Sequence, residues 1–383
     1  MYQTIGKLIS KARIEKCGDR EFPVLSMTMH DGIMFQGDRF KKQIASVDQS
    51  TYNVVKRNQL VVSFPIDEGV LAVQDITDAG IVSPAYKIWD IDQESVVPKY
   101  LELFLRSPHS IQYYKSKLRG TTARRRSITD ADLLDMEIPL PSIERQGCII
   151  EIINKVKQIQ NVYKEKLDLL DELIKARFVE MFGDPIDNNE KLCIKPFSDC
   201  CVDMHQGINT VADKVDYQLE GYPIIQSKNI TKGYLDLEDA RYLSQADYDK
   251  YHEKYNPQVN DLLICNIGTI GKSYIITTPQ SFLIAWNLFL VKLDLNVINS
   301  IYAKVFIEML NEKKYFDRFL TGGTVKFVNK KTMGAIPTPI PAMELQEEFA
   351  GFVKQIDKSK VEVQKALDKT RVLFDSLMQE YFG

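Results

Sequence analysis

The chain has 383 residues, 44% of them hydrophobic, and its 49 basic and 52 acidic residues leave a formal net charge of −3. This length exceeds one small core, so we expect two or more domains, and the average apolar content indicates a soluble, folded protein. No apolar run reaches the roughly 18 to 20 residues of a membrane span, and the N-terminus lacks the basic and apolar stretches of a signal peptide. The small net charge neither favours nor excludes a nucleic-acid partner, because the local distribution of cations decides that question.

The six cysteines and four histidines show no spacing typical of a metal site. There is no Cys-x-x-Cys, and the histidines are scattered along the chain. Unpaired thiols of this kind are typical of a reducing compartment. We therefore expect a cytoplasmic protein with free thiols and no metal ion.

Residues 1–138 are predicted to form the first domain. Short apolar runs between Gly, Pro and Asp predict strands near residues 22–25, 59–63, 69–73, 80–84 and 86–89, and helices are expected near 99–106 and 109–118. The domain closes on a basic segment that has no acidic residue from Ser107 to Arg126. Candidate DNA contacts in this segment are Lys115, Arg119, Thr121, Arg124, Arg125 and Arg126.

Residues 139–185 are predicted to form a long helix. The Pro-Leu-Pro at 139–141 cannot continue a helix backwards. After it, apolar residues such as Ile149, Ile153 and Val156 recur every three or four positions along one face. The pattern ends at Gly183, just before a proline. Roughly 35 helical residues would make a rod of about 50 Å, whose apolar stripe needs a partner.

Residues 186–338 are predicted to form a second domain with the same order of parts. Residues 223–225 match residues 23–25, and residues 260–264 match residues 58–62. A basic segment again lies beside a Gly/Thr turn, and this repetition favours phosphate contacts over a merely solvated helix end. Candidate DNA contacts here are Gln206, Asn209, Lys228, Asn229, Thr269, Lys272, Thr324 and Lys326.

Residues 339–383 repeat residues 139–183 without a gap. Both copies carry a Pro-x-Pro, then a Glu-x-Gln (Gln146 and Gln346), then the helical pattern, and both end in Phe-Gly. The chain is thus one domain-plus-helix unit written twice. We predict an α+β fold in which two similar α/β domains are separated by two long antiparallel helices. These helices would form a coiled coil around a pseudo-two-fold axis.

Residues 268–273, Gly-Thr-Ile-Gly-Lys-Ser, resemble the end of a phosphate-binding P-loop but do not fit it. The first glycine of that motif would fall at Asn266. Residues 274–279 have the pattern of a strand, whereas a P-loop needs a helix whose N-terminus faces the phosphates. We interpret the segment as a turn between two strands that presents Thr269 and Lys272.

The chain carries no recognisable catalytic motif. It has neither an Asn/Asp-Pro-Pro-aromatic motif nor a Gly-rich cofactor loop of a methyltransferase, and no paired acids of a nuclease stand out. This favours a binding protein over an enzyme.

The doubled arrangement of Pro-x-Pro, Glu-x-Gln and long helix resembles the specificity subunits of type I restriction–modification systems. The resemblance rests on residues 138–146, 170–185, 226–233 and 260–271 and on the terminal helix, and it covers essentially the whole chain. The second helix departs from it mildly, with Leu345 where the first copy has Arg145.

This resemblance implies a non-catalytic subunit that reads a bipartite site on double-stranded DNA. Residues 1–138 and 186–338 would be target-recognition domains, one for each half-site, and the helices at 139–185 and 339–383 would set the length of the unread spacer. Two modification (methyltransferase) subunits that methylate adenine N6 would dock on the spacer helices, and restriction subunits would complete the assembly. The chain itself would hold no cofactor, because S-adenosylmethionine, ATP and Mg²⁺ would bind only to the partner subunits.

Two alternatives stay open at this point. The chain could be the recognition portion of a self-contained DNA methyltransferase or restriction enzyme, which predicts that it binds S-adenosylmethionine. It could instead be a coiled-coil scaffold with no nucleic-acid role, which predicts no salt-dependent binding of duplex DNA.

Overall fold

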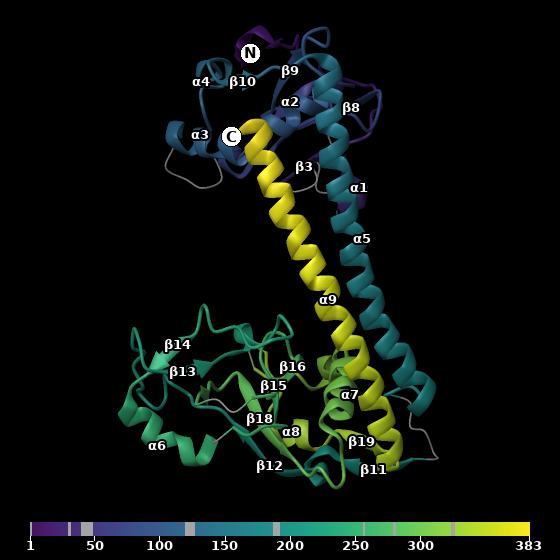
Figure 1. Ribbon diagram of the computed structural model, residues 1–383, viewed down its shortest axis with the longest axis vertical. Coiled ribbons are helices and arrows are strands. Elements are labelled where there is room, and N and C mark those ends of the chain that lie inside the picture. Colours follow the sequence, from purple (N-terminus) through teal and green to yellow (C-terminus); the bar gives the residue numbers. More distant parts are fainter. Residues whose placement is uncertain are drawn as a thin grey trace. The chain divides into compact units, whose positions relative to one another are not determined.

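The computed structural model describes residues 2–29, 32–39, 49–118, 127–186, 192–255, 257–278, 281–322 and 326–383. The chain divides into two compact units, each of which contains part of both long helices (Figure 1). Unit 1 comprises Met1–Lys164 with Lys365–Gly383, and unit 2 comprises Glu165–Gln364. The mixture of helices and strands confirms the predicted α+β class. Within the ranges described, no helix combines the length and apolar character needed to cross a membrane.

Unit 1 is built on a four-stranded antiparallel sheet in the order β2-β9-β6-β7. These strands are β2 (Ile9–Lys11), β9 (Lys87–Ile91), β6 (Leu60–Val62) and β7 (Leu71–Val73). Three two-stranded ladders join β1 (Tyr2–Thr4) to β10 (Glu137–Pro139), β3 (Leu25–Thr28) to β4 (Gly32–Phe35), and β5 (Asn53–Lys56) to β8 (Ala79–Val82). The shorter helices are α1 (Gln36–Arg39), α2 (Pro98–Leu105), α3 (Pro108–Lys117) and α4 (Asp130–Leu134), with 3-10 turns η1 (Ile5–Lys7) and η2 (Ile66–Glu68).

Most of the strands and helices predicted for the first domain occur at the expected residues. Helices α2 and α3 and strands β6 to β9 lie where the apolar runs predicted them. The run at 22–25 is the exception, because β3 begins only at Leu25. Pro23 has no N–H to donate to a strand ladder, which is a physical reason for the late start.

Unit 2 has a corresponding four-stranded antiparallel sheet in the order β12-β18-β15-β16. Its strands are β12 (Cys201–Gln206), β18 (Leu288–Leu293), β15 (Leu262–Cys265) and β16 (Ser273–Ile275). A three-stranded sheet contains β14 (Arg241–Leu243), β13 (Tyr222–Ile225) and β17 (Leu283–Ile284), and β11 (Cys193–Pro196) pairs with β19 (Pro337–Ile340). The shorter helices are α6 (Gln245–Tyr255), α7 (Ser300–Glu312) and α8 (Lys330–Gly334), with 3-10 turns η4 (Phe197–Cys200), η5 (Ser227–Asn229) and η6 (Tyr315–Phe319).

The two units share one scaffold. Their four-stranded sheets have the same strand order, and in each unit a helix follows the second strand in that order, α2 after β9 and α7 after β18. The residue two positions before β6 and its counterpart before β15 adopt the same uncommon conformation, since Asn58 has φ 66° and Asn260 has φ 75°. Asparagine tolerates this left-handed region better than most residues. The sequence match between residues 58–62 and 260–264 is therefore a match of backbone geometry as well.

The Glu-x-Gln motif has the same structural role in both units. The side chain of Gln146 is fully buried; it accepts from the Val97 amide at 2.8 Å and donates to the carbonyls of Ser95 and Pro141. Gln346 is buried equally and makes the matching bonds to Asn299, Val297 and Pro341. Each glutamine thus joins the first turn of a long helix to the loop that enters α2 or α7.

The long helices are α5 (Ile143–Phe182) and α9 (Met343–Phe382). In unit 1 the start of α5 packs with the end of α9, and Ile149, Ile153, Met378 and Phe382 share one apolar cluster. In unit 2 the end of α5 packs with the start of α9, where the rings of Phe178 and Phe349 lie 5.6 Å apart. Each core is therefore completed by segments roughly 200 residues apart in the sequence.

Candidate nucleic-acid interface

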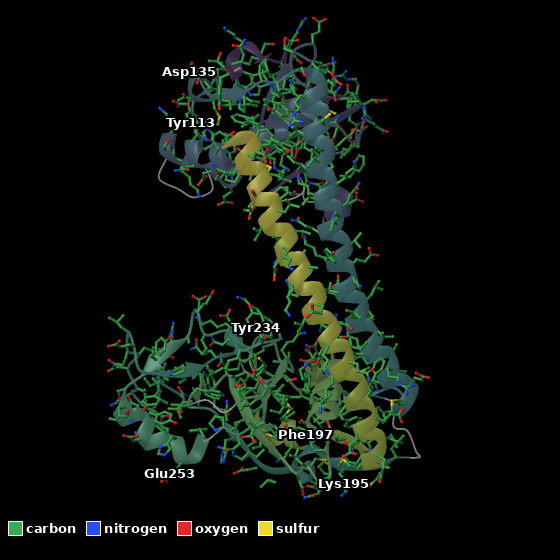
Figure 2. All side chains as sticks on the ribbon, in the orientation of Figure 1. Tyr113, Asp135, Lys195, Phe197, Tyr234 and Glu253 are labelled. Atoms are coloured by element: carbon green, nitrogen blue, oxygen red, sulfur yellow. The ribbon has the colours of Figure 1, made fainter. Side chains whose placement is uncertain are left out.

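The basic segment that closes the first domain lies largely outside the described residues. Arg119, Thr121, Arg124, Arg125 and Arg126 fall outside them, as does Thr324. Lys115 is described, and it is exposed on α3. This helix is fixed near its end, because the hydroxyl of Tyr113 (labelled in Figure 2) donates to the carbonyl of Asp132 at 2.8 Å. The predicted segment thus follows a well-anchored helix.

In unit 2 several loops converge at the link between β17 and β18. The Trp286 amide donates to the carbonyl of Ile208 at 2.9 Å, which joins the link to the segment after β12. The Asn287 carbonyl accepts from the hydroxyl of Ser227 at 3.0 Å and from the Asn266 amide at 3.3 Å. These bonds bring together segments that follow β12, β13 and β15. We call Gln206, Ser227, Asn266, Trp286, Asn287 and Phe327 the Trp286 junction.

Of the first predicted contacts, Gln206 is the last residue of β12 and Asn209 lies on the segment that follows it. The Gln206 side-chain amide donates to the Trp286 carbonyl at 2.9 Å, so this residue belongs to the junction. Gly207, which lies between Gln206 and Asn209 in the sequence, has no room for a side chain, since a Cβ atom would lie 2.3 Å from the Ala285 carbonyl oxygen. The Asn209 side chain accepts from the Ala212 amide at 3.1 Å and shapes the next turn.

Lys228 and Asn229 lie together on η5 but differ in exposure. Asn229 is 1% exposed; its side chain accepts from the Gln226 amide at 2.9 Å and donates to the Asp236 carbonyl at 2.8 Å. The neighbouring Lys228 is exposed, and its ammonium donates to the Asp239 carbonyl at 2.6 Å. Asn229 thus holds the loop in shape, while Lys228 presents the charge on its surface.

Thr269 and Lys272 are both exposed in the turn between β15 and β16. Gly268 and Gly271 have φ 74° and 83°, a conformation that favours glycine. A Cβ atom on Gly271 would also lie 2.8 Å from that of Asn311. Because strand β16 follows this turn, the interpretation as a strand–turn–strand segment is confirmed and the P-loop geometry is excluded.

Lys326, the last described candidate, is exposed beside the junction. Its neighbour Phe327 forms a reciprocal pair of backbone hydrogen bonds with Thr321, and the Phe327 ring centroid lies 6.2 Å from that of Trp286. Residues 313–331 contain six cations and a single acidic residue, Asp317. The junction is therefore next to a strongly basic stretch of chain, which suits contact with phosphates.

The sequence reasoning missed the centre of this arrangement. Trp286 is 38% exposed although tryptophan is usually well buried, whereas Trp89 of unit 1 is 2% exposed. Asn266 is fully buried, and among the described residues its side-chain nitrogen and oxygen have no hydrogen-bond partner. The side-chain oxygen of Asn287 is likewise unpaired within those residues. The one available sequence signal was the placement of Asn266 directly after a strand.

A hollow of about 810 Å³ in unit 2 lies elsewhere, among α7 and the long helices. Ion pairs span its lining, with Lys360 2.6 Å from Asp171, Lys175 2.7 Å from Glu312, and Lys304 2.8 Å from Glu308. The first two pairs join neighbouring helices, and the third lies within α7. We assign this hollow to helix packing and place the candidate interface at the Trp286 junction.

The comparisons with known proteins bear on the kind of domain and on the fold. Residues 205–370 match the family model of the type I restriction modification DNA specificity domain, and this range contains the whole junction. No curated protein matches the chain. Its fold is similar to that of a chain in a solved structure on the complex assembly and conformational transition of the type I R-M system. The TM-score is 0.61 and the sequence identity is 15%, and the match covers 100% of this chain and 97% of that one. It is also similar to the type I restriction–modification S subunit from M. genitalium, with TM-score 0.53 and 13% identity over 100% and 96% of the two chains.

At these identities the solved structures establish the fold, and the family match adds the kind of domain. The match covers the second repeat, and the same strand order in unit 1 shows that the scaffold occurs twice. Residues 205–370 therefore form a domain similar to the DNA specificity domain of type I restriction modification systems, and the whole chain has the fold of the two solved proteins.

Proposed function

We propose that each unit reads one half of a bipartite site on double-stranded DNA and that the chain directs adenine-N6 methylation or cleavage by partner subunits. The observation that carries this proposal is one scaffold used twice with unlike loops. The four-stranded sheets have the same order, yet unit 2 adds the sheet β14-β13-β17 and α6 where unit 1 has separate strand pairs. Two similar readers with different loops suit two different half-sites.

The candidate contacts divide by chemistry into two groups. Lys115, Lys272 and Lys326 are exposed cations suited to backbone phosphates, which position a protein on DNA without reading its sequence. Gln206, Asn209 and Thr269 carry the amide and hydroxyl groups that form hydrogen bonds with base edges. Lys228 and Asn229 would act as a pair, since the buried asparagine fixes the loop from which the lysine extends.

The finer architecture belongs to the same proposal. The two long helices would form an antiparallel coiled coil between two recognition domains, on which two modification subunits dock. Both helices leave apolar side chains exposed, as expected of surfaces that bind other proteins. On α5 these include Ile159, Val162, Leu169 and Leu173, and on α9 Val361, Val372 and Leu373. Restriction subunits would join the assembly in the cytoplasm.

We assign the catalysis and all cofactors to the partner subunits. S-adenosylmethionine, ATP and Mg²⁺ would bind there and not to this chain. The segment at 268–273 supports this assignment for nucleotides, because the strand that follows it cannot direct a helix N-terminus at phosphates. Burial also raises the pKa of the Cys265 thiol at the end of β15, which keeps this residue protonated and unreactive.

Exchange of the second domain tests the proposal directly. Residues 186–338 are replaced by those of a related subunit with a different methylated motif, and host DNA is mapped for methyladenine. We expect one half of the motif to change and the other to stay; a change in both halves would overturn the division of labour. The reciprocal exchange of residues 1–138 is the matched control.

Two further measurements address the alternative functions. The purified chain should not bind S-adenosylmethionine, and saturable binding would favour a self-contained enzyme. The chain with its modification subunits should bind duplex DNA with an affinity that falls steeply with salt. A lack of DNA binding at low salt would favour the scaffold.

A further inference from the structure

Trp286 is the most unusual side chain of the junction. Fully burying a large aromatic ring normally stabilises a protein, yet this ring is 38% exposed at the meeting point of three loops. We propose that Trp286 is a specificity-determining residue of unit 2, whose ring inserts at a base step of the second half-site and stacks on the base face that the step uncovers. This inference rests on the proposed function, because it names the part of unit 2 that touches the bases.

The backbone around this ring is held in place before any DNA binds. The Trp286 amide donates to Ile208 and its carbonyl accepts from Gln206, each at 2.9 Å. The ring of Phe327 lies beside it, inclined at 55°. A ring presented from a fixed backbone loses little conformational freedom on binding, so more of the contact energy appears as affinity.

The surroundings of the ring are those of a binding site rather than of an optimised core. Asn266 is fully buried with both ends of its amide unpaired among the described residues. Buried polar groups without partners are rare in folded proteins and, where they occur, call for a functional or structural explanation. Asn266 and the buried, unpaired side-chain oxygen of Asn287 adjoin the one exposed tryptophan of the described chain.

The charge of the neighbouring chain indicates DNA as the occupant. Phe327 lies within residues 313–331, which contain six cations and one acidic residue. An aromatic ring beside cations suits duplex DNA, since the cations neutralise phosphates and a ring inserted at a base step packs against the base face that it exposes. An acidic protein partner would use the cations but has no base to place on the ring.

The first unit has no equivalent of this ring. The residue that corresponds to Trp286 in the first repeat is Pro84, given the alignment of residues 260–264 with 58–62. A contact made by Trp286 should therefore affect only the second half-site. This asymmetry separates stacking on a base from any general effect on folding or assembly.

The test uses the complex of the full chain with its modification subunits and duplexes that carry the motif found by methylation mapping. Trp286→Ala should weaken binding about 5- to 150-fold, the equivalent of the roughly 1–3 kcal/mol measured for one stacked base. It should also reduce discrimination against changes in the second half-site and leave discrimination in the first unchanged. Trp286→Phe keeps a ring and should restore most of the affinity, whereas Trp286→Leu keeps apolar bulk without a ring and should not.

A second readout reports the ring itself. Trp89 and Trp286 are the only two tryptophans of the chain, so Trp89→Phe leaves Trp286 as the sole indole. Its emission from the purified full chain should be quenched by the specific duplex and not by one altered in the second half-site.

Each outcome decides the inference. Equal affinity of the Leu variant and the wild type would assign Trp286 to packing and overturn it, as would unaltered emission on a duplex that demonstrably binds. In both cases wild-type binding and methylation would leave the proposed function standing. A wild-type complex that fails to bind any duplex would instead refute the proposed function.

Discussion

Replacing Gln146 by alanine is expected to destabilise unit 1 by about 3 to 5 kcal/mol and to leave unit 2 unchanged. The side chain is 0% exposed and makes three hydrogen bonds, at 2.8, 2.9 and 3.3 Å, all to backbone groups. Truncation leaves the half-buried Val97 amide without its partner, which costs about 1–3 kcal/mol. The two lost bonds to carbonyls add about 1 kcal/mol each. Gln346 makes the same set of contacts in unit 2 and provides the matched control.

The two tryptophans make the assay specific for each unit. Trp89 is buried in unit 1 and Trp286 lies in unit 2, so single-tryptophan chains report the unfolding of one unit at a time. With a urea m-value near 3 kcal/mol/M, Gln146→Ala should lower the midpoint seen by Trp89 by about 1 to 1.7 M. Gln346→Ala should do the same to the transition seen by Trp286. A shift of the midpoint of less than about 0.3 M at an unchanged m-value would refute the conclusion that these glutamines stabilise their units.

Three further predictions concern the DNA contacts, the long helices and an ion-pair site. Triple alanine replacement of residues 124–126 in the assembled complex should weaken binding to all sequences and reduce the salt slope by about one per lost phosphate contact; an unchanged slope contradicts it. The Gln160 side chain donates to the Thr370 carbonyl at 3.1 Å, so these two residues face each other across the paired helices. Four residues inserted after Gln160 and four after Thr370 should therefore keep the helices paired. The added ~5.4 Å should lengthen the unread spacer by one or two base pairs of ~3.4 Å. Methylation mapping measures this, and an unchanged spacer with full activity would show that the helices are not the ruler. Asp130→Asn should cost unit 1 up to about 1 kcal/mol at pH 7, because the carboxylate pairs at 2.7 and 2.5 Å with lysines of β2 and β9 but is 29% exposed. Burial raises the pKa of Asp130, but the two lysines lower it by more, so its pKa in the folded protein lies below the usual value. The ion pairs therefore stabilise unit 1 above the unfolded pKa of about 3.9, and this stabilisation is lost as the pH falls through the lower folded pKa. Unfolding curves of the two proteins should therefore converge once the pH falls below the lowered folded pKa, and a difference that persists there would contradict the ion-pair explanation.

Much of the architecture was determined by sequence patterns that act locally. The apolar repeat at three and four residues specified α5 and α9, and the paired prolines specified where each could begin. The alternation of apolar runs and turns located β6, β7 and β9, and the run after Lys272 excluded a phosphate loop. These features depend on neighbours a few residues apart, so the order of side chains along the chain contains the necessary information. The repeat then implied that whatever one half forms, the other half forms again.

Contacts between distant segments decided the rest. The sequence marked Gln146 as part of a repeated motif, but only the folded chain shows that it joins the long helix to the entry of α2. Asn229 looked like an exposed contact of the same kind as Lys228, and it is buried because the loop at Gln226 and Asp236 closes around it. Trp286 drew no notice in the sequence, since its importance comes from three loops that meet there from positions up to 80 residues away. Burial and hydrogen bonding of this type are properties of the space between segments, and no local pattern of residues encodes them.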